Sequence, residues 1–227
     1  MTALGLIALL SSSLPAQAQD PMEIAAKGMH DLWLFLLGDE RINRVVFESL
    51  SAEYAVADVE RVQPADQALR FRELSQRITT AQLEHAPPWF REGLAEYYAL
   101  LEVRGPVSLV KANGQYMEVL SKARPPSLDD LFSLDDSAWH EGGDPPYSMQ
   151  AWSLIYFLLQ SRHGRYALQD MVRWAEDNPE NGNAMIVALD RAYPGGLVKL
   201  ERDWHEWMVA APLNVARLSR PWAKPLL

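Results

Sequence analysis

The chain has 227 residues and a formal net charge of −9. Hydrophobic residues make up 48% of it and charged residues 22%, which excludes a disordered chain and allows a sizeable core. The acidic balance argues against a nucleic-acid partner, because phosphate binding needs a basic face. There is no cysteine, so disulfides, thiolate metal sites and cysteine nucleophiles are excluded.

Residues 1–18 have the pattern of a signal peptide. An apolar run, Ala3–Leu10, is followed by Ala16-Gln17-Ala18, a cleavage pattern that predicts a mature chain beginning at Gln19. No Lys or Arg precedes the run, and an ordinary apolar amino-terminal helix is the alternative interpretation. The run is too short to cross a bilayer, and no later segment is long enough. We therefore expect a secreted or periplasmic protein with no membrane span in the mature chain.

Residues 19–64 predict a helix and short strands. Ile24–Leu37 is mixed apolar and favours a helix, whereas Val45–Phe47 and Tyr54–Val59 are rich in β-branched and aromatic residues and favour strands. Ala65–Thr80 follows with a helical period and few breakers, which predicts a second helix.

Two prolines separate this helix from the next one. Pro87-Pro88 stops the preceding helix and suits the first turn of a new one, which we expect over Trp89–Glu102. Asn113-Gly114 lies between β-prone runs and is the strongest hairpin signal in the chain. Residues 125–146 are acidic and loop-rich. Their carboxylates lack the spacing of a calcium-binding loop, which favours solvated loops and helix caps.

The carboxy-terminal third predicts further helices. Gln150–Ser161 is apolar nearly all round, as in a central buried helix. The other expected helices are Tyr166–Glu176, Ala184–Tyr193 and Leu197–Val209, followed by a tail at 212–227. We therefore predict a mainly α fold, α+β at most, with a small β-hairpin or short strands.

The string PPWFREGLAEYY at residues 87–98 is the most distinctive motif. It resembles the second metal-binding helix of gluzincin-type zinc peptidases, and specifically the bacterial peptidase MA-like family of uncertain function. PPSLDDLFSLDD and YSMQAWSLIYFLLQSRHG, further along the chain, are similar to that family's loop and following helix. The resemblance covers roughly residues 65–210 and implies a gluzincin-like helical domain over 65–211.

The resemblance implies a zinc site whose ligands are largely missing here. Such peptidases place two histidines at i and i+4, a general-base Glu after the first, and a third ligand on another helix. Glu92 takes the third-ligand position, and the stretch that aligns with HExxH begins at Arg72 and ends at Gln76. Only Glu73, at the general-base position, is retained. Arg72 cannot ligate zinc because it stays protonated and has no acceptor lone pair.

We therefore expect Arg72 and Gln76 to face Glu92, with a guanidinium–carboxylate pair making two N–H···O bonds in the metal's place. Tyr147, at a position where an active relative could stabilise an oxyanion, is a second vestigial candidate. These features predict a catalytically inactive, exported protein without a cofactor, which either binds a peptide or protein or retains no activity.

Other interpretations remain open. An active zinc-dependent peptidase or other hydrolase could use a non-standard metal site that combines His85 with Glu92. Without the resemblance, the helix is simply amphipathic, with Glu92 and Glu96 on a solvated face. That reading leaves Gly93 unexplained, because glycine costs about 1 kcal/mol inside a helix and suggests a closely packed neighbour. Motifs for serine hydrolases, phosphate-binding loops and dinucleotide sites are missing, so an unrelated enzyme class lacks support.

Overall fold

The structure is a computed structural model that describes residues 21–47, 49, 64–104, 107–122, 127–141 and 146–210. Within these ranges the protein is mainly helical, with one two-stranded antiparallel hairpin, as predicted. None of the helices described combines the length and the apolar character that a membrane span needs. The predicted signal peptide, the predicted strand Tyr54–Val59 and the tail at 212–227 lie outside the described residues.

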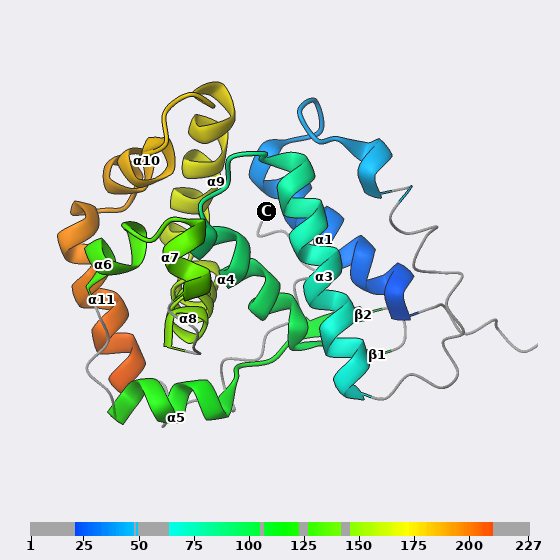
Figure 1. Cartoon of the computed structure of the whole chain (residues 1–227), viewed down its shortest axis with the longest axis horizontal. Helices are drawn as coiled ribbons and strands as arrows, with labels where there is room; N and C mark the ends of the chain where they lie inside the picture. The colour runs from blue at the N-terminus through cyan, green and yellow to red at the C-terminus, as the bar shows by residue number, and fades with distance from the viewer. Residues whose placement is uncertain are drawn as a thin grey trace, which may run out of the picture.

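Figure 1 shows the helices and the hairpin in chain order. The elements are α1 (Pro21–Leu37), α3 (Pro64–Gln82), α4 (Pro88–Ala99), β1 (Leu101–Arg104), β2 (Val107–Val110), α5 (Gly114–Lys122), α6 (Leu128–Phe132), α7 (Asp136–Glu141), α8 (Pro146–Gln160), α9 (Arg162–Asp177), α10 (Ala184–Ala192) and α11 (Gly196–Ala210). The helices expected at the positions of α1, α3, α4 and α8 to α11 are confirmed, with small shifts at their ends.

Helix α4 runs through the middle of the molecule and is buried over almost its whole length (Figure 1). It packs against α3 on one side and α8 on another. At Gly93 the backbones of α4 and α8 approach so closely that an added Cβ would lie 2.7 Å from the carbonyl oxygen of Ala151 and 2.8 Å from Cγ1 of Ile155. The close neighbour expected at this glycine is therefore confirmed, and it fixes α4 against α8.

The remaining helices complete a single apolar core around α4 and α8. Helix α1 packs against α3, α9 and the hairpin, and it carries Trp33 edge-on to Phe90 of α4. Helix α11 closes over α8, where the Trp204 indole donates a hydrogen bond of 3.1 Å to the hydroxyl of Ser153. The expected central position of α8 follows from its burial between α4, α9 and α11.

The hairpin predicted at Asn113-Gly114 is wrong in position. The hairpin joins β1 to β2, with Leu101 opposite Val110, and Gly114 begins α5 instead. Asn113 precedes this helix and its side-chain oxygen accepts a hydrogen bond of 3.1 Å from the backbone N–H of Tyr116. Asparagine followed by glycine suits a helix start as well as a turn. Here capping prevails, and Gly114 accordingly does not have the positive φ of a type I′ turn.

Two further predictions differ from the structure. Residues 44–47 are helical where Val45–Phe47 was expected to be a strand. Phe47 is buried and packs edge-on against His30 of α1, whereas Val45 is exposed, so tertiary context overrides the strand propensity of these residues. Helix α4 ends at Ala99 rather than Glu102, because Leu101 pairs with β2.

The acidic stretch at 125–146 contains two short helices, α6 and α7, with acidic residues at their starts, as the cap interpretation implies. Ser127 and Asp130 form a reciprocal capping box at α6.

Candidate functional site

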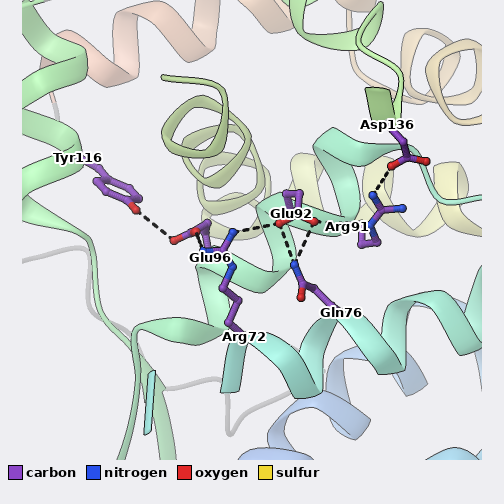
Figure 2. A network of polar contacts seen from close by, with 7 residues as sticks. All are labelled: Arg72, Gln76, Arg91, Glu92, Glu96, Tyr116 and Asp136. Carbon is purple, nitrogen blue, oxygen red and sulfur yellow. Dashed lines mark hydrogen bonds and ion pairs between the residues drawn. The ribbon is translucent and has the colours of Figure 1, made fainter. Parts of the chain in front are cut away.

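Helices α3 and α4 bring Arg72, Gln76 and Glu92 together (Figure 2). Arg72 and Gln76 lie one turn apart on α3 and so project from the same face. The Gln76 amide nitrogen lies 3.0 and 2.9 Å from the two carboxylate oxygens of Glu92, and Arg72 Nη2 donates to Glu92 Oε2 at 3.2 Å. The predicted convergence of these three side chains is confirmed.

A second carboxylate, Glu96, joins this cluster. Arg72 Nη1 lies 2.9 Å from Glu96 Oε1, so the guanidinium is divided between two carboxylates one turn apart on α4. The prediction that both N–H···O bonds would go to Glu92 is therefore wrong in this detail. The interpretation of Glu92 and Glu96 as a solvated face is also wrong, because these residues are only 6% and 8% exposed.

Tyr116 extends the network to α5. Its hydroxyl donates a hydrogen bond of 3.1 Å to Glu96 Oε2, and its ring lies edge-on to Trp152 of α8. Burial raises the pKa of Tyr116 to about 12, and the neighbouring Glu96 charge acts in the same direction. Tyr116 therefore remains a neutral donor at physiological pH and ties α5 to α4.

Arg91 extends the network to α7. Its Nε lies 3.6 Å from Glu92 Oε1, and its Nη2 pairs with Asp136 at the start of α7. The network thus contains two guanidiniums and three carboxylates, with Gln76 and Tyr116 as neutral donors. The carboxylates of Glu92 and Glu96 are buried beneath these donors, whereas the Arg72 side chain remains 36% exposed.

The other two candidate residues, Glu73 and Tyr147, lie outside this network. Glu73 is exposed on α3, although its neighbour Arg72 turns inward. Tyr147 lies in the first turn of α8, where its half-buried ring contacts Trp139 of α7 at a centroid distance of 6.1 Å. Neither side chain is seen to bond to the network in the described part of the chain.

The residues present do not fit a zinc ion. Zinc prefers imidazole, thiolate and carboxylate ligands, whereas the groups facing Glu92 are a guanidinium and a primary amide. Across the described ranges, no group of three or more His, Cys, Asp or Glu side chains could hold a metal ion. His85 is exposed in the turn after α3 and lines a different hollow, formed with the turn between α9 and α10.

An open hollow of about 580 Å³ lies beside the network. It is bounded by the first half of α3, the junction of α4 with β1, and the start of α5. Phe71, next to Arg72, and Leu101 contribute apolar lining, while Gln67 and Gln115 contribute amides. Its volume falls within the range of sites that bind small ligands or peptide side chains.

Comparison of the chain with protein-family models, with curated proteins and with solved structures finds no match.

Proposed function

We propose that this chain is an exported, catalytically inactive relative of the peptidase MA-like metallopeptidases that acts as a peptide- or protein-binding module. The observation that carries the proposal is the position of Arg72. Its guanidinium lies against the carboxylate expected to be the third zinc ligand, at the place of the first histidine. A permanent cation there takes over the electrostatic role of the metal without its chemistry.

The consequence for catalysis follows from the mechanism of zinc hydrolases. The metal lowers the pKa of its bound water, and the general base then removes a proton from that water. Arg72 can balance the Glu92 charge, but it has no open coordination position for a water molecule. Glu73, at the general-base position, is exposed and has no activated water to act on. We therefore expect no peptide hydrolysis and no resident cofactor.

The hollow between α3, β1 and α5 supports a role in binding. It combines an apolar floor with amide side chains, and such a mixture suits an extended peptide. The charged side chains at its edge are paired, Lys111 with Glu102 and Glu118 with Lys122. A neutral, apolar peptide segment is therefore the ligand that we expect there.

Two measurements on the purified protein test the proposal. Metal analysis should find no stoichiometric zinc, and incubation with an unfolded casein substrate should give no cleavage above a buffer control. Stoichiometric zinc together with cleavage that a chelator abolishes would instead establish the alternative, an active zinc hydrolase. In that case His85→Ala and Glu92→Gln would show whether those residues form its non-standard site.

Export has a separate test. Expression of the whole chain in a bacterium, followed by cell fractionation, should place the mature protein in the periplasm or the medium, with Gln19 as its first residue. Recovery of an uncleaved chain in the cytoplasm would contradict the proposed export without affecting the assignment of the Arg72 site.

A further inference from the structure

Helix α9 carries an unusual pair of exposed aromatic residues. Among the aromatic side chains that the structure describes, only Tyr166 and Trp174 are exposed, at 45% and 40%. Both belong to α9, which packs between α1 and α10 and against α8 (Figure 1). They are eight residues apart, so they lie about 12 Å apart along the helix axis and within about 80° of one another around it.

An arginine lies over each of these rings. The Arg162 guanidinium carbon is 5.7 Å from the Tyr166 ring centroid, and that of Arg191, from α10, is 5.3 Å from the Trp174 ring centroid. Stacking on an aromatic face holds a guanidinium in place while leaving its N–H edge free for bidentate hydrogen bonds to a carboxylate. Tyr, Trp and Arg are also the residue types that contribute most to protein-binding hot spots.

The charges around the two stacks point to an acidic partner. Arg162 and Arg191 are exposed, and neither makes an ion pair within the described part of the chain. Arg41, on the same side of the molecule, differs because Glu176 and Asp177 already neutralise it. Each of the two stacks thus presents an unpaired cation on a chain whose net charge is −9.

We infer that the exposed face of α9 is a docking surface for an acidic, extended segment of another protein. Two carboxylates of that segment pair with Arg162 and Arg191, while neighbouring apolar groups cover Tyr166 and Trp174. Each guanidinium carbon lies within 5.7 Å of its ring centroid, and the rings are about 12 Å apart along the helix axis. Because an extended chain rises about 3.3 Å per residue, that ring spacing corresponds to acidic residues about four positions apart. Asp170, exposed between the two rings, favours a basic residue midway between them.

Three rhodamine-labelled peptides of equal length test this surface by fluorescence anisotropy. The first has two glutamates four residues apart with a lysine midway, and the other two carry glutamine or lysine in place of both glutamates. The glutamate peptide should bind at least roughly tenfold more tightly than either of the others, which corresponds to about 1.4 kcal/mol. Equal binding of the three peptides, or no binding, would overturn the inference.

Variants locate the binding on α9. R162E/R191E should abolish the preference for the glutamate peptide, and Y166A/W174A should weaken its binding, since all four side chains are exposed. R70E/R202E, on α3 and α11, gives the same change in net charge and should bind like the wild type. Melting curves and circular dichroism confirm that each variant folds. Unchanged binding by R162E/R191E would refute the inference.

A membrane surface is the competing anionic partner. Sedimentation with vesicles of phosphatidylcholine and phosphatidylserine should leave the protein in solution. Binding to the vesicles without binding to the glutamate peptide would contradict an acidic protein partner. The inference does not depend on the Arg72 site, so zinc binding or peptidase activity would leave it standing, and its failure would not affect the function proposed for that site.

Discussion

The two faces of α4 are packed by different physical means. Toward α8 the contact is apolar and close, and Gly93 leaves no room for a methyl group beside Ala151. Toward α3 the same helix presents the carboxylates of Glu92 and Glu96, which are held by Arg72. Shape alone determines the first contact, whereas the second depends on every charged group having its partner.

This contrast explains why the two faces constrain substitution differently. A close apolar contact tolerates other apolar side chains as long as the volume is kept. A buried carboxylate that loses its cation carries an uncompensated charge, and the loss exceeds the net contribution of the intact pair. The α3 face should therefore be the more sensitive one to the loss of a single side chain.

The largest expected effect follows from Arg72→Met. This change leaves two buried carboxylates without their shared guanidinium, so it should lower the free energy of unfolding by about 3 kcal/mol, as when one partner of a buried pair is removed. Arg41→Met is the matched control, because Arg41 also contacts two carboxylates but on the surface, and it should destabilise the protein far less, since exposed ion pairs contribute little to stability. Urea denaturation measures both. Equal losses of unfolding free energy would show that the α3 face is no more sensitive than an exposed ion pair.

A double-mutant cycle sharpens this prediction. Glu92→Met alone should cost less than Arg72→Met, because Arg72 then keeps Glu96 as a partner. The combined variant should lose less stability than the sum of the two single changes, because the pair is removed together. Additive losses would refute an energetic coupling between Arg72 and Glu92.

On the other face, Gly93→Ala should cost about 2 kcal/mol. The added methyl group must displace the backbone of Ala151 or the side chain of Ile155, and this overpacking outweighs the better helix propensity of alanine. Gly114→Ala is the control, since no atom lies within 4 Å of the added Cβ there. Thermal or urea unfolding of both variants measures the difference. A Gly93→Ala variant as stable as the control would contradict the close contact of α4 and α8.

The smallest expected effect belongs to Tyr116→Phe. Removing the hydroxyl takes one hydrogen bond from Glu96 and should cost about 1 kcal/mol at pH 8. Because the folded-state pKa of Tyr116 is raised to about 12 from the usual 10, its contribution is fully present below pH 10 and is lost as the pH rises toward 12. The stability difference between the wild type and this variant should therefore shrink over that range. A difference that stays constant would show that Tyr116 ionises alike in both states.

The extent to which sequence predicted the structure differs between the helices and the site. Helical periodicity located α1, α3 and the carboxy-terminal helices, because each buries one continuous apolar face. The contact of Arg72 and Gln76 with Glu92 followed from a resemblance and its spacing, not from composition. The parts of Glu96 and Tyr116 in the network were not predicted, for two physical reasons. Burial of Glu96 depends on a cation from another helix. Tyr116 lies in the first turn of α5, and the Asn113-Gly114 pair before it can start a helix as readily as a turn.

The most direct test of the proposed loss of a metal site places histidines at the two positions where the resemblance expects them. The double variant R72H/Q76H would place two imidazoles one turn apart on α3, facing Glu92, with Glu73 beside the first. Equilibrium dialysis against zinc followed by metal analysis should find stoichiometric zinc in this variant and none in the wild type, and the further change Glu92→Gln should remove it. A folded R72H/Q76H protein that binds no more zinc than the wild type would contradict the account.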